Sequence, residues 1–422
     1  MTRLLLALSG PAARHPGLRR VIGSGVLVAV GYIDPGNWAT DIAGGAGFGY
    51  GLLAVVFAAA LLAMGFQILV ARLALATGQD LAALTTRYLP RSVANAAWLA
   101  GEAAILATAL AELIGGAIAL RLLFGLPLLA GIAVTGIATL TVFYVARGQV
   151  QRHEQIIAAL LGIVALSFVI LLAKARPDLM AITDGVAHTA HALADPRGFM
   201  IALGILGATL MPHNLYLHSG ELAQRAQGLP PGLRGIAFRL ARQDTVISLS
   251  LAMLVNAAIM IVAAASLAGQ GPVVANLDAA HAAIAQSLGA GAALLFALAL
   301  YASGQSSTIT GVMAGKILSR GFERGKQVSA SRRALMTRVA AGLAAAAMLL
   351  TGGSAHPDSI LVLSQVILSL ALPFALIPLV LLACRSDVMG RWKLSAGWAA
   401  AALCCSVGIV ILDAYLLADM MV

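Results

Sequence analysis

The sequence predicts an all-α polytopic membrane protein with about eleven transmembrane helices: a five-plus-five inverted repeat followed by one extra C-terminal helix. Its 422 residues are 60% apolar and 10% charged, against about 45–50% and about 25% in soluble domains. The apolar residues form long unbroken runs, which exclude a water-soluble enzyme, a disordered chain and a collagen-like fibre. Runs without alternation also disfavour an outer-membrane barrel.

Eleven apolar runs are long enough to cross a bilayer, which takes about 20 residues per helix. They are 20–45, 51–76, 92–121, 124–145, 153–174, 198–226, 240–268, 282–318, 333–352, 357–383 and 396–419. Several exceed the minimum, which permits tilt or an extension into water.

The runs divide the chain into two halves of five helices. We expect a cytoplasmic N-terminal tail (1–19), a first repeat (20–174), a solvated outer loop (175–197), a second repeat (198–383), and a connecting loop with the eleventh helix (384–422).

The basic residues predict the orientation. With a cytoplasmic N-terminus, 23 of the 27 Lys and Arg fall on the cytoplasmic side and 4 outside, as the positive-inside rule expects. An odd number of spans places the C-terminus outside. The net charge of +10 is therefore assigned to orienting loops rather than to nucleic-acid binding.

The three cysteines (Cys384, Cys404, Cys405) form neither a disulfide framework nor a CxxC metal clip.

Two of the spans contain matching breaks. The first carries Asp34-Pro35-Gly36-Asn37 and the sixth carries Met211-Pro212-His213-Asn214, 177 residues later. Proline removes a backbone donor and interrupts a helix, and irregular backbone at membrane depth is tolerated where it lines a cavity or is buried in protein. Matched breaks in two halves indicate a transporter with its site near the bilayer midplane.

The breaks bring candidate metal ligands together. Asp34 supplies a carboxylate, Asn37 an amide oxygen and Met211 a thioether, while unwinding frees carbonyls such as those of Gly31 and Ala208. An acid at this depth is costly and by default functional, although it could also bind a helix end. A thioether disfavours Ca²⁺ and Mg²⁺ and tolerates Mn²⁺, Fe²⁺, Co²⁺ and Cd²⁺, if Met211 is a ligand rather than core packing.

At these motifs the sequence resembles the Nramp family, proton-coupled divalent-metal transporters of the leucine-transporter-like fold. The resemblance covers most of the chain. It includes GYIDPGNWATDIAG (31–44), GATLMPHNLYLHS (207–219), residues 67–73 and 107–120, GQSSTITG (304–311) and LSQVILSLALPFA (363–375).

The resemblance implies that Asp34, Asn37, Met211 and the Ala208 carbonyl bind the metal, with Gln365 joining in some conformations. The magnesium-transporting relatives lack the Asn and the Met of these motifs, so both residues favour transition metals. We therefore expect secondary active import of Mn²⁺ or Fe²⁺, and also Cd²⁺ or Co²⁺, across a bacterial inner membrane. The metal is substrate, and we expect no resident cofactor.

The proton pathway is predicted from His213, Glu102, Glu112 and Arg338. Histidine titrates near physiological pH, and intramembrane acids form proton relays or salt bridges. A structural role for His213 is the alternative. The family's third helix usually reads Thr-Asp-Leu-Ala-Glu, whereas this chain has Ala109 in place of the aspartate. We therefore expect weak proton coupling.

Three other functions compete with metal–proton symport. The nearest is a proton-uncoupled metal uniporter of the same fold. A sodium-coupled amino-acid symporter would face repulsion between Asp34 and the substrate carboxylate and would leave Met211 without a role. A membrane-embedded metallohydrolase would need more histidine or carboxylate ligands than the spans supply. The sequence therefore favours a transporter over an enzyme, with metal ions, protons and the bilayer as partners.

Overall fold

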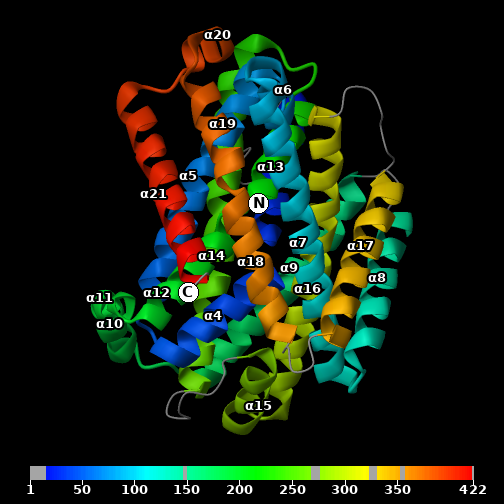
Figure 1. The fold of residues 1–422 in the computed structure, drawn as a ribbon, viewed down its shortest axis with the longest axis vertical. Helices are drawn as coiled ribbons and strands as arrows, with labels where there is room; N and C mark the ends of the chain where they lie inside the picture. The colour runs from blue at the N-terminus through cyan, green and yellow to red at the C-terminus, as the bar shows by residue number, and fades with distance from the viewer. Residues whose placement is uncertain (1–15, 146–149, 268–275, 323–329, 352–356, 421–422) are drawn as a thin grey trace.

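The computed structural model describes residues 16–145, 150–267, 276–322, 330–351 and 357–420 (Figure 1). Within these ranges the regular elements are helices and none is a strand. Most of the long helices run along the long axis of the molecule and form one bundle (Figure 1).

The first half of the chain has helices in each of the first five predicted segments and two short helices that lie largely outside them. They are α2 (Pro16–Val21), α3 (Ser24–Gly31), α4 (Pro35–Phe48), α5 (Leu53–Thr77), α6 (Leu81–Tyr88), α7 (Arg91–Phe124), α8 (Leu128–Val145) and α9 (Val150–Ala175).

The rest of the described chain begins with two short connecting helices and ends with the eleventh predicted span. Its elements are α10 (Leu179–Ala187), α11 (Thr189–Ala194), α12 (Pro196–Thr209), α13 (Pro212–Arg225), η2 (Pro231–Leu233), α14 (Arg234–Leu267), α15 (Leu277–Leu288), α16 (Ala290–Phe322), α17 (Ala330–Thr351), α18 (Pro357–Ala371), α19 (Pro373–Cys384), α20 (Ser386–Met389), η3 (Gly390–Trp392) and α21 (Ala396–Met420).

Eight stretches of the described chain are long and apolar enough to cross a membrane, and α8 and α17 contain shorter apolar helices. The first predicted span is divided between α3 and α4. These lengths and compositions are those of an integral membrane protein.

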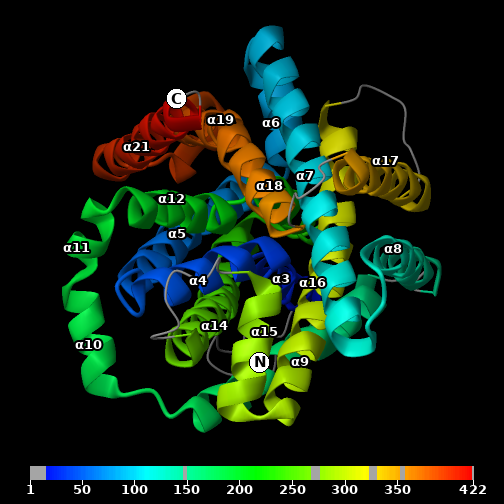
Figure 2. The ribbon, with the colours of Figure 1, turned by 60° about the horizontal axis from the view of Figure 1, so that its bottom comes forward.

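Two segments differ from the sequence-based expectation. The predicted span 282–318 is divided into α15 and α16 at Gly289, whose φ of 92° interrupts the helix. Residues 175–197, the predicted outer loop, contain α10 and α11, which run around the edge of the bundle (Figure 2). Asp178 and Asp195 cap α10 and α12 by accepting backbone N–H groups. The hydropathy of the sequence does not predict these helix caps and turns.

Both predicted breaks are present. The first separates α3 from α4, and the second separates α12 from α13, each with a proline at the start of the second half-helix. Proline is favoured there because the first helical N–H has no partner within the helix.

Trp38 anchors the second half of the first broken span. Its fully buried ring makes edge contacts with Phe168 of α9 and Phe296 of α16, with ring centroids 5.1 and 5.3 Å away. Gly115 of α7 lies against Pro35, so closely that a β-carbon at 115 would be 2.3 Å from the proline ring. Small residues permit such close helix packing in membranes, and these contacts fix the break inside the bundle.

Candidate metal-binding site

The two breaks meet at the side chain of Asn37. Its amide nitrogen donates to Asp34 Oδ1 at 2.8 Å and to the Ala208 carbonyl at 3.1 Å. The backbone N–H of Asn37 donates to the same Asp34 oxygen at 2.9 Å. All three residues are buried. One amide thus connects an acid from the first broken span with a carbonyl from the sixth.

The free carbonyls follow from the positions of the prolines. In a helix, the carbonyl of residue i accepts from the N–H of residue i+4. Pro35 and Pro212 stand four residues after Gly31 and Ala208, and proline has no N–H to donate. The sequence therefore frees one acceptor at the end of each first half-helix, and Asn37 takes the one on Ala208.

Asp34 has unused capacity to bind a cation. It caps α4 through Oδ1, while its buried Oδ2 has no hydrogen-bond partner within the described residues. A buried carboxylate oxygen without a donor is costly unless a charge compensates for it. The C-terminal ends of α3 and α12, which carry partial negative charge, lie at the breaks and also favour a cation.

Met211 lies buried at the second break. The amide of Asn214 contacts its sulfur at 3.6 Å. Asn214 also lies against Gly31, where a β-carbon would be 2.3 Å from the Asn214 amide nitrogen. Asn214 had no predicted role, although it matches Asn37 in the repeated Pro-x-Asn pattern, which was the signal in the sequence.

Gln365 reaches the site from α18. Its side chain packs against Gly36, donates to Ser364 Oγ at 2.9 Å, and leaves Oε1 without a hydrogen bond in the described structure. No group of three or more His, Cys, Asp or Glu residues in the described ranges could hold a metal. The arrangement is therefore one carboxylate surrounded by neutral amide, carbonyl and thioether groups.

His213 is buried and directed toward α7. Its Nδ1 lies 3.4 Å from Thr108 Oγ1, and its Nε2 has no partner among the described residues. The structure therefore places this predicted proton carrier between the second break and the third transmembrane helix.

Glu112 of α7 forms a buried ion pair with Arg338 of α17. Its two oxygens also accept the hydroxyls of Ser307 at 2.8 Å and Thr308 at 3.0 Å, both from α16. Glu102 lies on the same helix as Glu112, ten residues earlier, and so about 15 Å away along the axis. The structure brings Glu112 and Arg338 together and leaves Glu102 apart.

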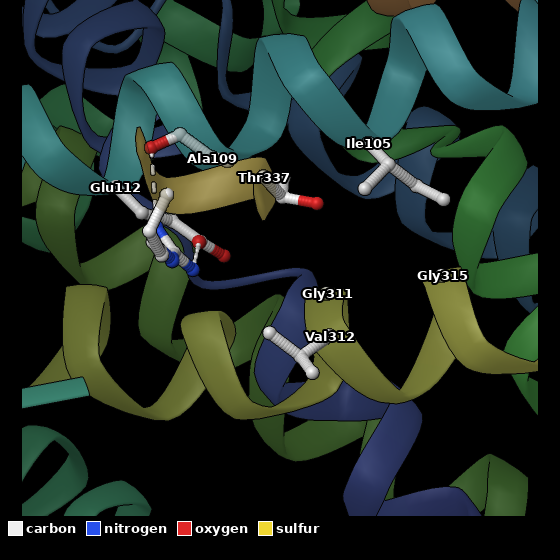
Figure 3. Close-up of a pocket in the computed structure, with 8 residues that line it drawn as sticks. Ile105, Ala109, Glu112, Gly311, Val312, Gly315 and Thr337 are labelled. Atoms are coloured by element: carbon white, nitrogen blue, oxygen red, sulfur yellow. Dashed lines mark hydrogen bonds and ion pairs between the residues drawn. The ribbon is translucent and has the colours of Figure 1, made fainter. Parts of the chain in front are cut away.

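Ala109 lies beside this ion pair. Its carbonyl accepts from Arg338 at 3.2 Å, and its side chain lines a cavity of about 10 Å³ together with Glu112 and Thr337. Figure 3 shows Ala109 and Glu112 on one side of the cavity and Gly311 and Gly315 of α16 on the other. This volume is close to the least that holds a water molecule.

A polar network joins α13 to α9 and to the chain at the end of α2. Arg225 of α13 pairs with Glu154 and Glu221 and donates to the carbonyls of Arg20 and Ile22. This network could not be predicted from the sequence, because its members lie on three separate segments of the chain, at 20–22, 154 and 221–225.

A second contact holds the start of the first broken span. Asp244 of α14 accepts the backbone N–H groups of Gly23 and Gly25 at 2.9 and 2.8 Å. Nearer the site, Gln67 donates to the Tyr32 hydroxyl and its oxygen lies 2.9 Å from His218 Nδ1. The first half-helix is thus tied to the bundle on several sides.

Known proteins resemble the chain over nearly its whole length. A family profile described as natural resistance-associated macrophage protein-like, or Nramp, matches residues 25–419. The divalent metal cation transporter MntH of Brucella suis is 45% identical over 401 residues, covering 94% of this chain and 87% of that protein. MntH 1 of Pseudomonas aeruginosa is 42% identical over 413 residues, covering 95% and 93%.

Solved structures of known transporters also resemble this chain. A variant of the Eremococcus coleocola manganese transporter has a TM-score of 0.81 at 30% identity, covering 95% of this chain and 87% of that one. MhsT, solved with L-phenylalanine, has a TM-score of 0.62 at 18% identity, covering 92% and 97%; this likeness concerns the fold alone. The inverted-repeat fold with broken first and sixth helices is therefore confirmed, and the chain belongs to the Nramp family.

Proposed function

We propose that this protein is a secondary transporter that imports divalent transition-metal ions, Mn²⁺ or Fe²⁺ and also Cd²⁺ or Co²⁺. The names of its relatives support divalent metal transport, with manganese named for the Eremococcus coleocola protein. The finer assignment of ions rests on the donor set at the two breaks. The metal is the transported substrate, and the protein is not an enzyme.

The observation that carries the proposal is the convergence of Asp34 Oδ1 and the Ala208 carbonyl on one amide group of Asn37. Two acceptors that face one donor from opposite helix breaks can face a cation in its place. Rotation of the Asn37 side chain would then present its own oxygen, and Asp34 Oδ2, which has no partner in the described structure, supplies the charge.

Met211 supplies the soft ligand in this scheme, and the Gly31 carbonyl and Gln365 complete the shell in other conformations. A mixed set of one carboxylate, neutral oxygens and a thioether suits Mn²⁺, Fe²⁺, Co²⁺ and Cd²⁺ better than Ca²⁺ or Mg²⁺. An amino-acid substrate would place its carboxylate beside Asp34, and like charges at this depth repel strongly.

Transport requires the site to open to each side in turn. The Arg225 network and the Asp244 cap hold α2 and the start of α3 against the bundle. Release of these contacts would open the arginine-rich end, which we assign to the cytoplasm because it carries most of the basic residues. The N-terminus is then cytoplasmic, the C-terminus is outside, and 20–174 and 198–383 are the two repeats of an inner-membrane protein.

Proton co-transport is the second part of the proposal. Two buried groups can exchange protons here, His213 and Glu112, and Arg338 is the ion-pair partner of Glu112. Ala109 stands where the family usually has an aspartate, so this region has one acid fewer. Coupling is therefore weak, and a proton-uncoupled metal uniporter is the alternative.

Calorimetry with Mn²⁺ on purified protein tests the metal site. Asp34→Asn removes the carboxylate charge while keeping the side-chain shape, so binding should fall below detection. Asp413→Asn is the control, because Asp413 is another buried acid, on α21, and accepts from Ser369 rather than from a residue at the helix breaks. Unchanged Mn²⁺ affinity in Asp34→Asn would show that the site lies elsewhere.

A further inference from the structure

A lateral groove separates α21 from the rest of the bundle. α21 packs mainly on α19 and touches α12, and most of its surface is exposed. Between α21, α5 and α14 the structure leaves a groove of about 480 Å³, within the range of ligand sites. It lies away from the helix breaks, because none of the proposed metal ligands lines it.

The walls of the groove are largely apolar. They include Leu61, Leu69, Phe238 and Trp398, and the side chains of Leu61 and Trp398 are 59% and 71% exposed. Gly65 also lines the groove, and a β-carbon there would meet no atom within 4 Å. These walls suit a hydrocarbon chain, which is what a bilayer presents to a transmembrane helix.

Two arginines and no acid line the same groove. Arg72 is held in place by donating to the carbonyls of Trp392 at 2.8 Å and Lys393 at 3.0 Å. Arg242 is exposed and has no hydrogen bond or ion pair within the described ranges. An edge contact between Phe238 and Trp392, 5.7 Å between ring centroids, lies beside them.

We propose that this groove binds one anionic diacyl phospholipid, with an acyl chain between α5, α14 and α21 and the phosphate on Arg242 and Arg72. Basic pockets between transmembrane helices bind anionic head groups, and a guanidinium binds phosphate in a directed, two-point manner. Arg242 supplies a positive charge that has no protein partner in the described structure. Arg72 supplies the N–H groups that it does not use on the carbonyls of Trp392 and Lys393.

The charge of the groove argues against other occupants. The N-terminal segment 1–15 carries Arg3 and Arg14 and no acid, so the two arginines would repel it. An apolar partner helix would leave Arg242 uncompensated, whereas an anionic lipid satisfies both the apolar walls and the cation. The bound lipid would fill the space between α21 and the helices α5 and α14.

Native mass spectrometry of the purified chain in mild detergent tests this proposal. Dioleoyl phosphatidylglycerol and dioleoyl phosphatidylcholine are added separately, because they share acyl chains and differ in net charge. The unmodified chain should retain one phosphatidylglycerol in preference to phosphatidylcholine. Arg242→Gln should lower that preference about fivefold, the effect of one basic residue near a lipid surface.

Gly65→Leu should reduce retention of both lipids, since the new side chain fills the groove without meeting protein. Gly162→Leu is the matched control, because Gly162 lies on the exposed face of α9 and also has no neighbour within 4 Å. If Gly65→Leu does not yield folded protein, Ala401→Leu blocks the opposite wall. Equal retention of the two lipids by the unmodified chain, or equal retention by the Gly65 and Gly162 variants, overturns the proposal.

Discussion

The side chain of Gln365 lies directly over Gly36, so that a β-carbon at position 36 would be 1.8 Å from the Gln365 amide nitrogen. This contact joins α18 to the first turn of α4, two residues after Asp34. Only glycine allows it, because any side chain at 36 would occupy the space of the amide. The close approach brings a residue of the tenth predicted span to the break in the first.

Gly36→Ala should therefore displace Gln365 and lower metal uptake at least about tenfold, which corresponds to about 1.4 kcal/mol. Gly47→Ala is the control, because Gly47 lies on the same helix and has no neighbour within 4 Å. The control should transport normally and gain helix stability. Equal uptake by the two variants would show that Gln365 does not need this position.

Met211→Ala should change selectivity more than total transport. Loss of the thioether removes the soft ligand, so Cd²⁺ affinity should fall most, Mn²⁺ transport should persist in part, and Ca²⁺ or Mg²⁺ should be better admitted. Competition of each ion with Mn²⁺ uptake into proteoliposomes measures this order.

Met260→Ala controls for packing, because Met260 is also buried but lies on α14 in an apolar cluster. Both changes leave a cavity that costs about 2–5 kcal/mol, but only the first should alter the ranking of ions. If Ca²⁺ stays as well excluded in Met211→Ala as in the control, Met211 is a packing residue.

The sequence was sufficient to predict the two helix breaks, because proline acts locally. Pro35 and Pro212 determine which carbonyls lose their partners, and both effects appear in the structure. The division at Gly289 was not predicted, since apolar residues continue on both sides of it. A single glycine with a positive φ changes direction without changing hydropathy.

Contacts between distant segments were harder to predict. Three such contacts join residues more than 180 apart in the chain: Asn214 against Gly31, Gln365 against Gly36, and Arg225 against the Arg20 carbonyl. Hydropathy and local motifs give the position of each residue along its own helix. They do not give the helix-to-helix packing that decides which side chains meet.

Glu112→Gln should destabilise the protein by about 3–5 kcal/mol, because it leaves the buried guanidinium of Arg338 without its counter-charge. Adding Arg338→Met to the same chain should recover much of this loss, since the uncompensated charge is then removed. Chemical unfolding in detergent micelles compares the two variants with the unmodified protein. A double variant less stable than the single one would contradict this account of the pair.

Ala109→Asp should increase proton flux. The Ala109 side chain lines the small cavity beside Glu112, and Arg338 already donates to the Ala109 carbonyl. A carboxylate at 109 would therefore lie within reach of the guanidinium and restore a second acid one turn before Glu112. Simultaneous Mn²⁺ and H⁺ uptake into proteoliposomes, across an imposed pH gradient, measures the number of protons moved per metal ion.

Ala109→Asn is the matched control, because it fills the same space and cannot carry a negative charge. The unmodified protein and the asparagine variant should show metal uptake with little proton flux and a shallow dependence on pH, whereas the aspartate variant should show a steeper one. The difference follows from the acid alone, since a proton relay in a low-dielectric bundle needs titratable groups within hydrogen-bond reach. A substantial proton-to-metal ratio that is the same in all three proteins would show that coupling is determined at another position, with His213 as the next residue to vary.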